Sequence, residues 1–204
     1  IDKGIKTVFF FFLVLDIPAT AAWSLDDYAH WLARQLPQKK QVKILGHSFG
    51  GQIAVRFNTL YPNRIEQLFL VASAGIPDNS FKIRLKRGIF LLLAKLGKQV
   101  TRSQVAKKLL YQFAHEQDYF RASEVQRQTM GQIIRSDIET ELSNITAPTV
   151  LIWGEQDRIT PFANTAIFLE RIRTSVLEPI IGARHSPVFT HPEITAEKVA
   201  QHFL

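Results

Sequence analysis

A single short turn constrains the fold of this 204-residue chain more than any other feature. Residues 46–51 read Gly-His-Ser-Phe-Gly-Gly; they follow the mostly apolar run 42–45 and precede a helical pattern of apolar residues, 49–60. A G-x-S-x-G sequence between a strand and a helix is typical of a tight, strained turn that needs small flanking residues and projects its serine from the end of the strand. Ser48 is therefore a candidate nucleophile, and the backbone N–H of Phe49 is a candidate oxyanion donor.

Two later strands end beside ionisable residues. The apolar run 149–153 is followed by Gly-Glu-Gln-Asp, which ends at Asp157, and the run 176–181 is followed by Gly-Ala-Arg-His, which ends at His185. In open α/β sheets, ligands bind outside the carboxyl ends of the strands. A serine hydroxyl is a poor nucleophile until a base takes its proton, and an imidazole titrates near neutral pH. We expect His185 to be the base for Ser48 and Asp157 to orient the imidazole.

Strand-like and helix-like stretches alternate along the chain. We expect strands at 8–15, 42–45, 65–71, 149–153 and 176–181, and helices at 24–36, 49–60, 161–173 and from residue 191 to the C-terminus. This alternation predicts an α/β fold with a mostly parallel sheet and helices on both faces. The stretch 76–145 interrupts the alternation, because it has a helical pattern and no strand of length.

These segments resemble the α/β-hydrolase fold family, of the serine esterase and lipase type. The matching stretches are 16–18, 24–36, 42–51, 70–74, 147–161 and 182–192. The order Ser48, Asp157, His185 is the order of the triad in that family. The resemblance implies that an acyl-enzyme forms on a small ester, a thioester or a C–C bond substrate, with no cofactor. Some members take the acid from the position of Asp78, which is the alternative acid, and His47 is expected to pack beside the pocket next to Phe49.

The resemblance also implies a domain organisation. Residues 1–75 and 146–204 would form the hydrolase core, and residues 76–145 a helical cap. No His-Gly pair precedes Ser48, so the second oxyanion donor is unaccounted for, and we expect the chain to lack the family's N-terminal strands. An alternative interpretation of residues 3–22 is a signal peptide. The alternative function is a non-catalytic or weakly active relative that binds a ligand or a membrane surface.

Charge and composition restrict the partners. The net charge is +7, and residues 82–108 carry nine Lys or Arg and no Asp or Glu. This stretch indicates either a lid helix with a solvated face or a surface that contacts an anionic membrane or an acidic substrate. Nucleic acid is not expected, because no binding motif accompanies the basic stretch. The absence of cysteine excludes disulfides and thiolate metal ligands and fits a cytoplasmic location, and the histidines show no metal-ligand spacing.

Overall fold

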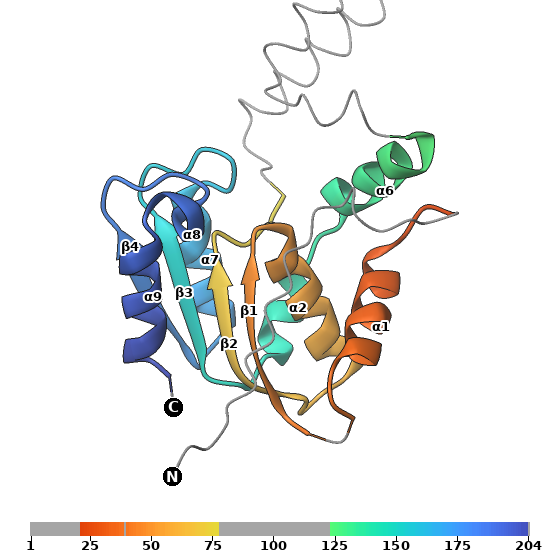
Figure 1. Cartoon of the computed structure of the whole chain (residues 1–204), viewed down its shortest axis with the longest axis horizontal. Coiled ribbons are helices and arrows are strands. Elements are labelled where there is room, and N and C mark those ends of the chain that lie inside the picture. Colours follow the sequence, from red (N-terminus) through yellow and green to blue (C-terminus); the bar gives the residue numbers. More distant parts are fainter. Residues whose placement is uncertain (1–20, 39, 78–122, 204) are drawn as a thin grey trace, which may run out of the picture.

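The computed structural model describes residues 21–38, 40–77 and 123–203. At the centre of this part lies a parallel sheet of four strands, in the order β1-β2-β3-β4 (Figure 1). The strands are β1 (Val42–His47), β2 (Ile65–Val71), β3 (Thr149–Gly154) and β4 (Ser175–Ile180). The strands predicted at 42–45, 65–71, 149–153 and 176–181 are confirmed within a residue or two, whereas the strand expected at 8–15 lies outside the described residues.

Helices cover both faces of the sheet, as predicted (Figure 1). Alternate side chains of a strand point to opposite faces. In β2, Leu68 and Leu70 join one buried cluster, and Phe69 and Val71 join the other. The first cluster is closed by α1 (Leu25–Gln35), α2 (Phe49–Leu60) and α7 (Thr165–Arg171), and the second by α8 (Pro187–Thr190) and α9 (Pro192–Gln201).

A local sequence signal explains where α1 begins. Ser24 and Asp27 form a capping box at the start of α1, with the Asp27 carboxylate accepting a hydrogen bond from the Ser24 backbone N–H at 2.8 Å.

The single helix predicted over 161–173 is wrong in detail. Pro161 keeps an extended backbone (ψ 138°), so the chain first makes the short 3₁₀ turn η2 (Phe162–Asn164), and α7 starts only at Thr165.

The segment before β3 is attached to the core by buried polar side chains. It consists of α6 (Glu124–Arg135) and the 3₁₀ turn η1 (Glu139–Asn144). The amide of Gln52, which is buried within α2, donates to the backbone carbonyls of Ile133 and Ser136. These residues fall within the predicted cap, 76–145, whose boundaries stay a prediction. The basic stretch 82–108 lies outside the described residues.

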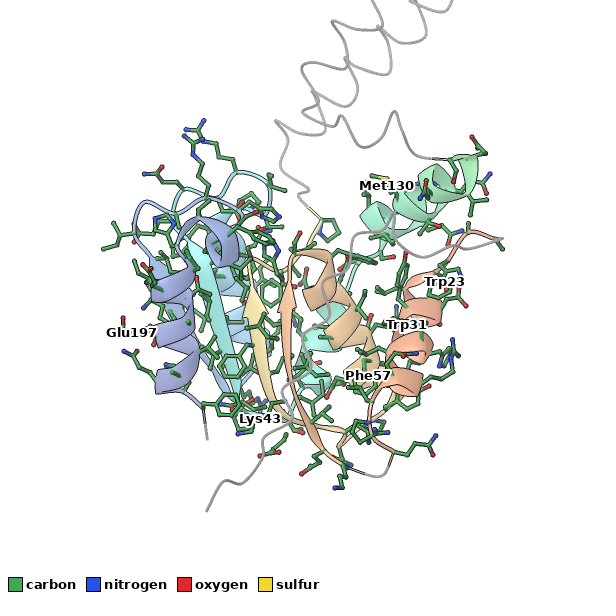
Figure 2. All side chains as sticks on the ribbon, in the orientation of Figure 1. Trp23, Trp31, Lys43, Phe57, Met130 and Glu197 are labelled. Carbon is green, nitrogen blue, oxygen red and sulfur yellow. The ribbon has the colours of Figure 1, made fainter. Side chains whose placement is uncertain are left out.

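The amino-terminal ends of the strands hold the last residues of the chain. The ammonium of Lys43 in β1 lies 4.2 Å from the centre of the Phe203 ring, and the Gln67 amide donates to the backbone carbonyl of His202. Figure 2 shows Lys43 near the lower end of β1, away from its arrowhead, with Glu197 on the outer side of α9. The candidate residues Ser48, Asp157 and His185 follow the opposite, carboxyl-terminal ends of β1, β3 and β4.

Within these described ranges, no helix combines the length and apolar character needed to cross a membrane. The same residues contain no group of three or more His, Cys, Asp or Glu side chains that could hold a metal ion.

Candidate active site

The turn between β1 and α2 has the strained backbone that its motif predicts. Ser48 adopts φ 53° and ψ −116°, a conformation that costs a non-glycine residue about 1–3 kcal/mol. Hydrogen bonds to β2 and to the segment that follows it hold it there: the Ser48 N–H donates to the Val71 carbonyl at 2.9 Å, and the Ser48 carbonyl accepts from the Ala74 N–H at 3.0 Å. The position of the serine is thus set by the neighbouring strand as well as by its own.

Only some of the glycines in this turn are required by packing. A Cβ atom on Gly46 would lie 2.6 Å from the Gly50 carbonyl oxygen, and one on Gly51 would lie 2.7 Å from the Ser73 Cβ. A Cβ on Gly50 would meet no atom within 4 Å. The prediction that small residues are needed on both sides of the serine therefore holds for Gly46 and Gly51, and is wrong for Gly50.

The side chains of Ser48, His185 and Asp157 form one hydrogen-bonded chain. His185 Nδ1 lies 2.9 Å from Asp157 Oδ2, and His185 Nε2 lies 2.9 Å from Ser48 Oγ. The Asp157 side chain is fully buried, and that of His185 is 14% exposed. Because a carboxylate only accepts hydrogen bonds, Nδ1 carries a proton, and in the neutral imidazole Nε2 is then the acceptor for the serine hydroxyl. The structure thus brings the three predicted residues together in an order suited to proton transfer.

Asp157 is held by donors on both of its carboxylate oxygens. Oδ1 accepts from the backbone N–H groups of Ile159 (2.8 Å) and Thr160 (3.0 Å), and Oδ2 accepts from the Thr160 hydroxyl (2.7 Å) as well as from His185. Burial alone would raise the pKa of Asp157, but the hydrogen bonds from His185, Thr160 and Ile159 outweigh it and hold the pKa below its ordinary value. The carboxylate therefore stays ionised at neutral pH.

The loops that carry Asp157 and His185 pack backbone against backbone. The Gln156 N–H donates to the Ala183 carbonyl at 2.9 Å, and a Cβ atom on Gly154 would collide with the carbonyl oxygens of Ala183 and Arg184. This contact fixes the separation of the two loops without any intervening side chain.

Thr160 is a residue of the site to which the sequence analysis assigned no role. Its hydroxyl lies 2.7 Å from Asp157 Oδ2, 3.1 Å from His185 Nδ1 and 3.1 Å from the carbonyl oxygen of Ala72 at the end of β2. Its carbonyl accepts from the buried Trp153 indole at 2.9 Å. A hydroxyl residue one turn after the candidate acid is the sequence signal that could have identified it.

The remaining residues predicted for the site are His47, Phe49 and Asp78. His47 donates from Nε2 to the backbone carbonyl of His185 at 2.9 Å. Phe49 begins α2, so its N–H has no acceptor within the helix, while its ring packs edge-on against Tyr28, with the ring centres 5.0 Å apart. Asp78, the alternative acid, lies outside the described residues.

We predict that Thr160→Val lowers kcat for ester hydrolysis about 10- to 100-fold, because a hydrogen bond to a charged group contributes about 1.5–3 kcal/mol. Valine keeps the shape and removes only the hydroxyl that holds Asp157. Steady-state kinetics with a chromogenic ester measure the loss. Thr160→Ser, which keeps the hydroxyl, is the matched control and should retain most of the activity. Equal kcat in the valine variant and the wild type would contradict the role.

Comparison with known proteins identifies the family. The family model described as "Serine aminopeptidase, S33" matches residues 23–190, which is most of the chain. The chain belongs to this family. Solved structures of α/β-hydrolases share its fold. A crystal structure of a membrane phospholipase A, described as a bacterial virulence factor, superposes with a TM-score of 0.67 at 22% sequence identity. The superposition covers 91% of this chain and 64% of the phospholipase chain.

Curated relatives of similar sequence include ester-cleaving enzymes. Pimeloyl-acyl-carrier-protein methyl ester esterase of Aeromonas salmonicida is 26% identical over 200 residues, which cover 85% of this chain and 76% of the esterase. Monoacylglycerol lipase ABHD6 of Rattus norvegicus is 24% identical over 184 residues, which cover 79% of this chain and about half, 54%, of the lipase. Together with the family match, these relatives support a hydrolase of the α/β fold.

Proposed function

We propose that this chain is a serine hydrolase that cleaves small carboxylic esters through an acyl-enzyme on Ser48. The observation that carries the proposal is the chain of hydrogen bonds from Ser48 through His185 to Asp157. The names of the relatives favour an ester over the thioester and C–C bond substrates that the family resemblance leaves open, because a methyl ester esterase and a monoacylglycerol lipase both cleave carboxylic esters.

Acylation begins with the serine hydroxyl. Ser48 Oγ attacks the acyl carbon as His185 Nε2 takes the hydroxyl proton, which gives a tetrahedral intermediate and an imidazolium. Asp157, ionised and fully buried, stabilises the imidazolium through Nδ1–H. The intermediate collapses when His185 returns the proton to the leaving alcohol, and the acyl group stays on Ser48.

Deacylation repeats these steps with water. His185 Nε2 takes a proton from the water that attacks the acyl carbon, and then returns it to Ser48 Oγ as the carboxylic acid leaves. The developing oxyanion would be stabilised by the Phe49 N–H at the positive end of the α2 dipole. A second oxyanion donor is not assigned among the described residues.

The test is labelling with a fluorophosphonate probe combined with turnover of p-nitrophenyl butyrate. We expect hydrolysis of the ester, loss of activity in proportion to labelling, and a phosphonylated peptide that contains Ser48. Ser143, which is exposed on η1, should remain unlabelled. Labelling at another serine, or a folded chain that neither reacts with the probe nor turns over the ester, would contradict the proposal; the second result would favour the non-catalytic alternative.

The proposed substrate is a small acyl compound. We also propose that the protein is located in the cytoplasm. Contact of residues 82–108 with an anionic membrane surface stays a prediction, tested by co-sedimentation with anionic liposomes at low and high salt.

A further inference from the structure

His47, the last residue of β1, contacts the loop that follows β4. Its Nε2 lies 2.9 Å from the backbone oxygen of His185, a residue 138 positions later in the chain. In the described sheet, β1 and β4 are the two outermost strands. This hydrogen bond therefore ties the strand that carries Ser48 directly to the loop that carries the candidate base.

The partner of His47 determines which of its nitrogen atoms carries the proton. A backbone carbonyl only accepts hydrogen bonds, so Nε2 is protonated and Nδ1 holds the lone pair of a neutral imidazole. Burial lowers the pKa of His47, and the charge of His185 acts in the same direction; the hydrogen bond to the His185 carbonyl and the Asp157 carboxylate offset part of the effect. With its pKa lowered, His47 is neutral at neutral pH and serves the His185 carbonyl as a hydrogen-bond donor.

The neutral state suits its neighbours. The ring centres of His47 and His185 lie 5.3 Å apart, and the Phe189 ring packs edge-on against His47 at 6.2 Å. His185 gains a positive charge when it takes the proton of Ser48, and a charged His47 at that distance would oppose this step. A neutral imidazole donates the hydrogen bond to the backbone without that repulsion.

We propose that His47 is a positioning residue: its Nε2–H holds the backbone of His185 so that the His185 imidazole stays within hydrogen-bonding distance of Ser48. The inference rests on the proposed function for its effect on catalysis. This role does not require His47 to contact the substrate.

Kinetics of three variants test the inference. His47→Leu removes the donor and should lower kcat about tenfold, with KM unchanged, which is the scale of one lost hydrogen bond. His47→Gln places an amide N–H near the position of Nε2 and should restore most of the loss. Phe189→Leu removes the ring contact and keeps the hydrogen bond, so it should behave like the wild type. Equal kcat in His47→Leu and the wild type, or a glutamine variant as slow as the leucine variant, would overturn the inference.

Nitrogen-15 NMR of the imidazoles separates this inference from the proposed function, because it needs no turnover. We expect the His47 signals of a neutral ring protonated at Nε2, and we expect the His185 signals to shift or broaden in His47→Leu and to recover in His47→Gln. If these signals appear but no ester is hydrolysed, the positioning role stands and the proposed function fails. A His47 ring protonated only at Nδ1 would overturn the inference whatever the activity.

Discussion

Ser48→Ala and His185→Ala, alone or combined, are expected to lower the kcat for ester hydrolysis by nearly the same factor, about 10⁶, because the nucleophile and its base act as a unit. Without Nε2 of His185 the serine keeps its proton, and without the serine hydroxyl the base has no nucleophile to activate. The double variant should therefore be no slower than either single variant. Steady-state kinetics with p-nitrophenyl butyrate measure all three.

Two controls show whether a loss of kcat comes from the chemistry or from damage to the fold. The thermal midpoint of each variant shows whether the fold is intact, since neither side chain belongs to the two hydrophobic clusters. His191→Ala changes a histidine whose Nδ1 contacts the Thr190 hydroxyl at 2.9 Å, outside the hydrogen-bonded chain of the site, and should leave the rate unchanged. Losses of kcat that multiply in the double variant would mean that the two residues act independently and would contradict the mechanism.

Asp157→Asn is expected to lower kcat about 10⁴-fold while the fold stays intact, through the wrong tautomer of the base. The backbone N–H groups of Ile159 and Thr160 both point at Oδ1, so the new amide must place its oxygen there and its NH₂ group toward His185. Nδ1 must then accept, the imidazole proton moves to Nε2, and Nε2 can no longer accept the proton of Ser48.

The matched control for the acid is Asp78→Asn, the alternative that the sequence leaves open. We expect it to retain nearly full activity. The same nitrogen-15 spectra report the tautomer of His185 directly, with Nδ1 protonated in the wild type and Nε2 protonated in Asp157→Asn. A severe loss in Asp78→Asn together with an active Asp157→Asn would reassign the acid to the segment after β2.

The meeting of Ser48, Asp157 and His185 could be predicted because each follows the carboxyl end of an apolar strand. Such strands are recognisable from composition, and in a parallel sheet their ends share one edge. The core could be predicted from composition too. Residues 68–71 of β2 are all apolar because Leu68 and Leu70 are buried on one face of the sheet and Phe69 and Val71 on the other.

The contacts that refine the site could not be predicted in this way. The hydrogen bond of His47 joins residues 138 positions apart, and the Thr160 hydroxyl lies 3.1 Å from the carbonyl oxygen of Ala72, 88 positions away, so both contacts depend on loop paths that no local pattern specifies. Gln52 lies in a helix where a polar residue usually indicates a solvent-exposed face, yet its amide is buried against two carbonyls. The start of the helical segment at Phe162, one residue later than predicted, likewise depends on the extended backbone of Pro161.

The crowding of backbone atoms around the site has a consequence for protein engineering. At Gly46, Gly51 and Gly154 even a methyl group would collide with its surroundings, so a mutant library aimed at these positions should return mainly misfolded chains. Ile159 and Ile181, by contrast, lie on the loops that carry Asp157 and His185 and are 73% and 81% exposed. Substitutions at these two exposed positions displace no core side chain, so a library aimed at them should return mainly folded chains in which the hydrogen bonds of Ser48, His185 and Asp157 are kept.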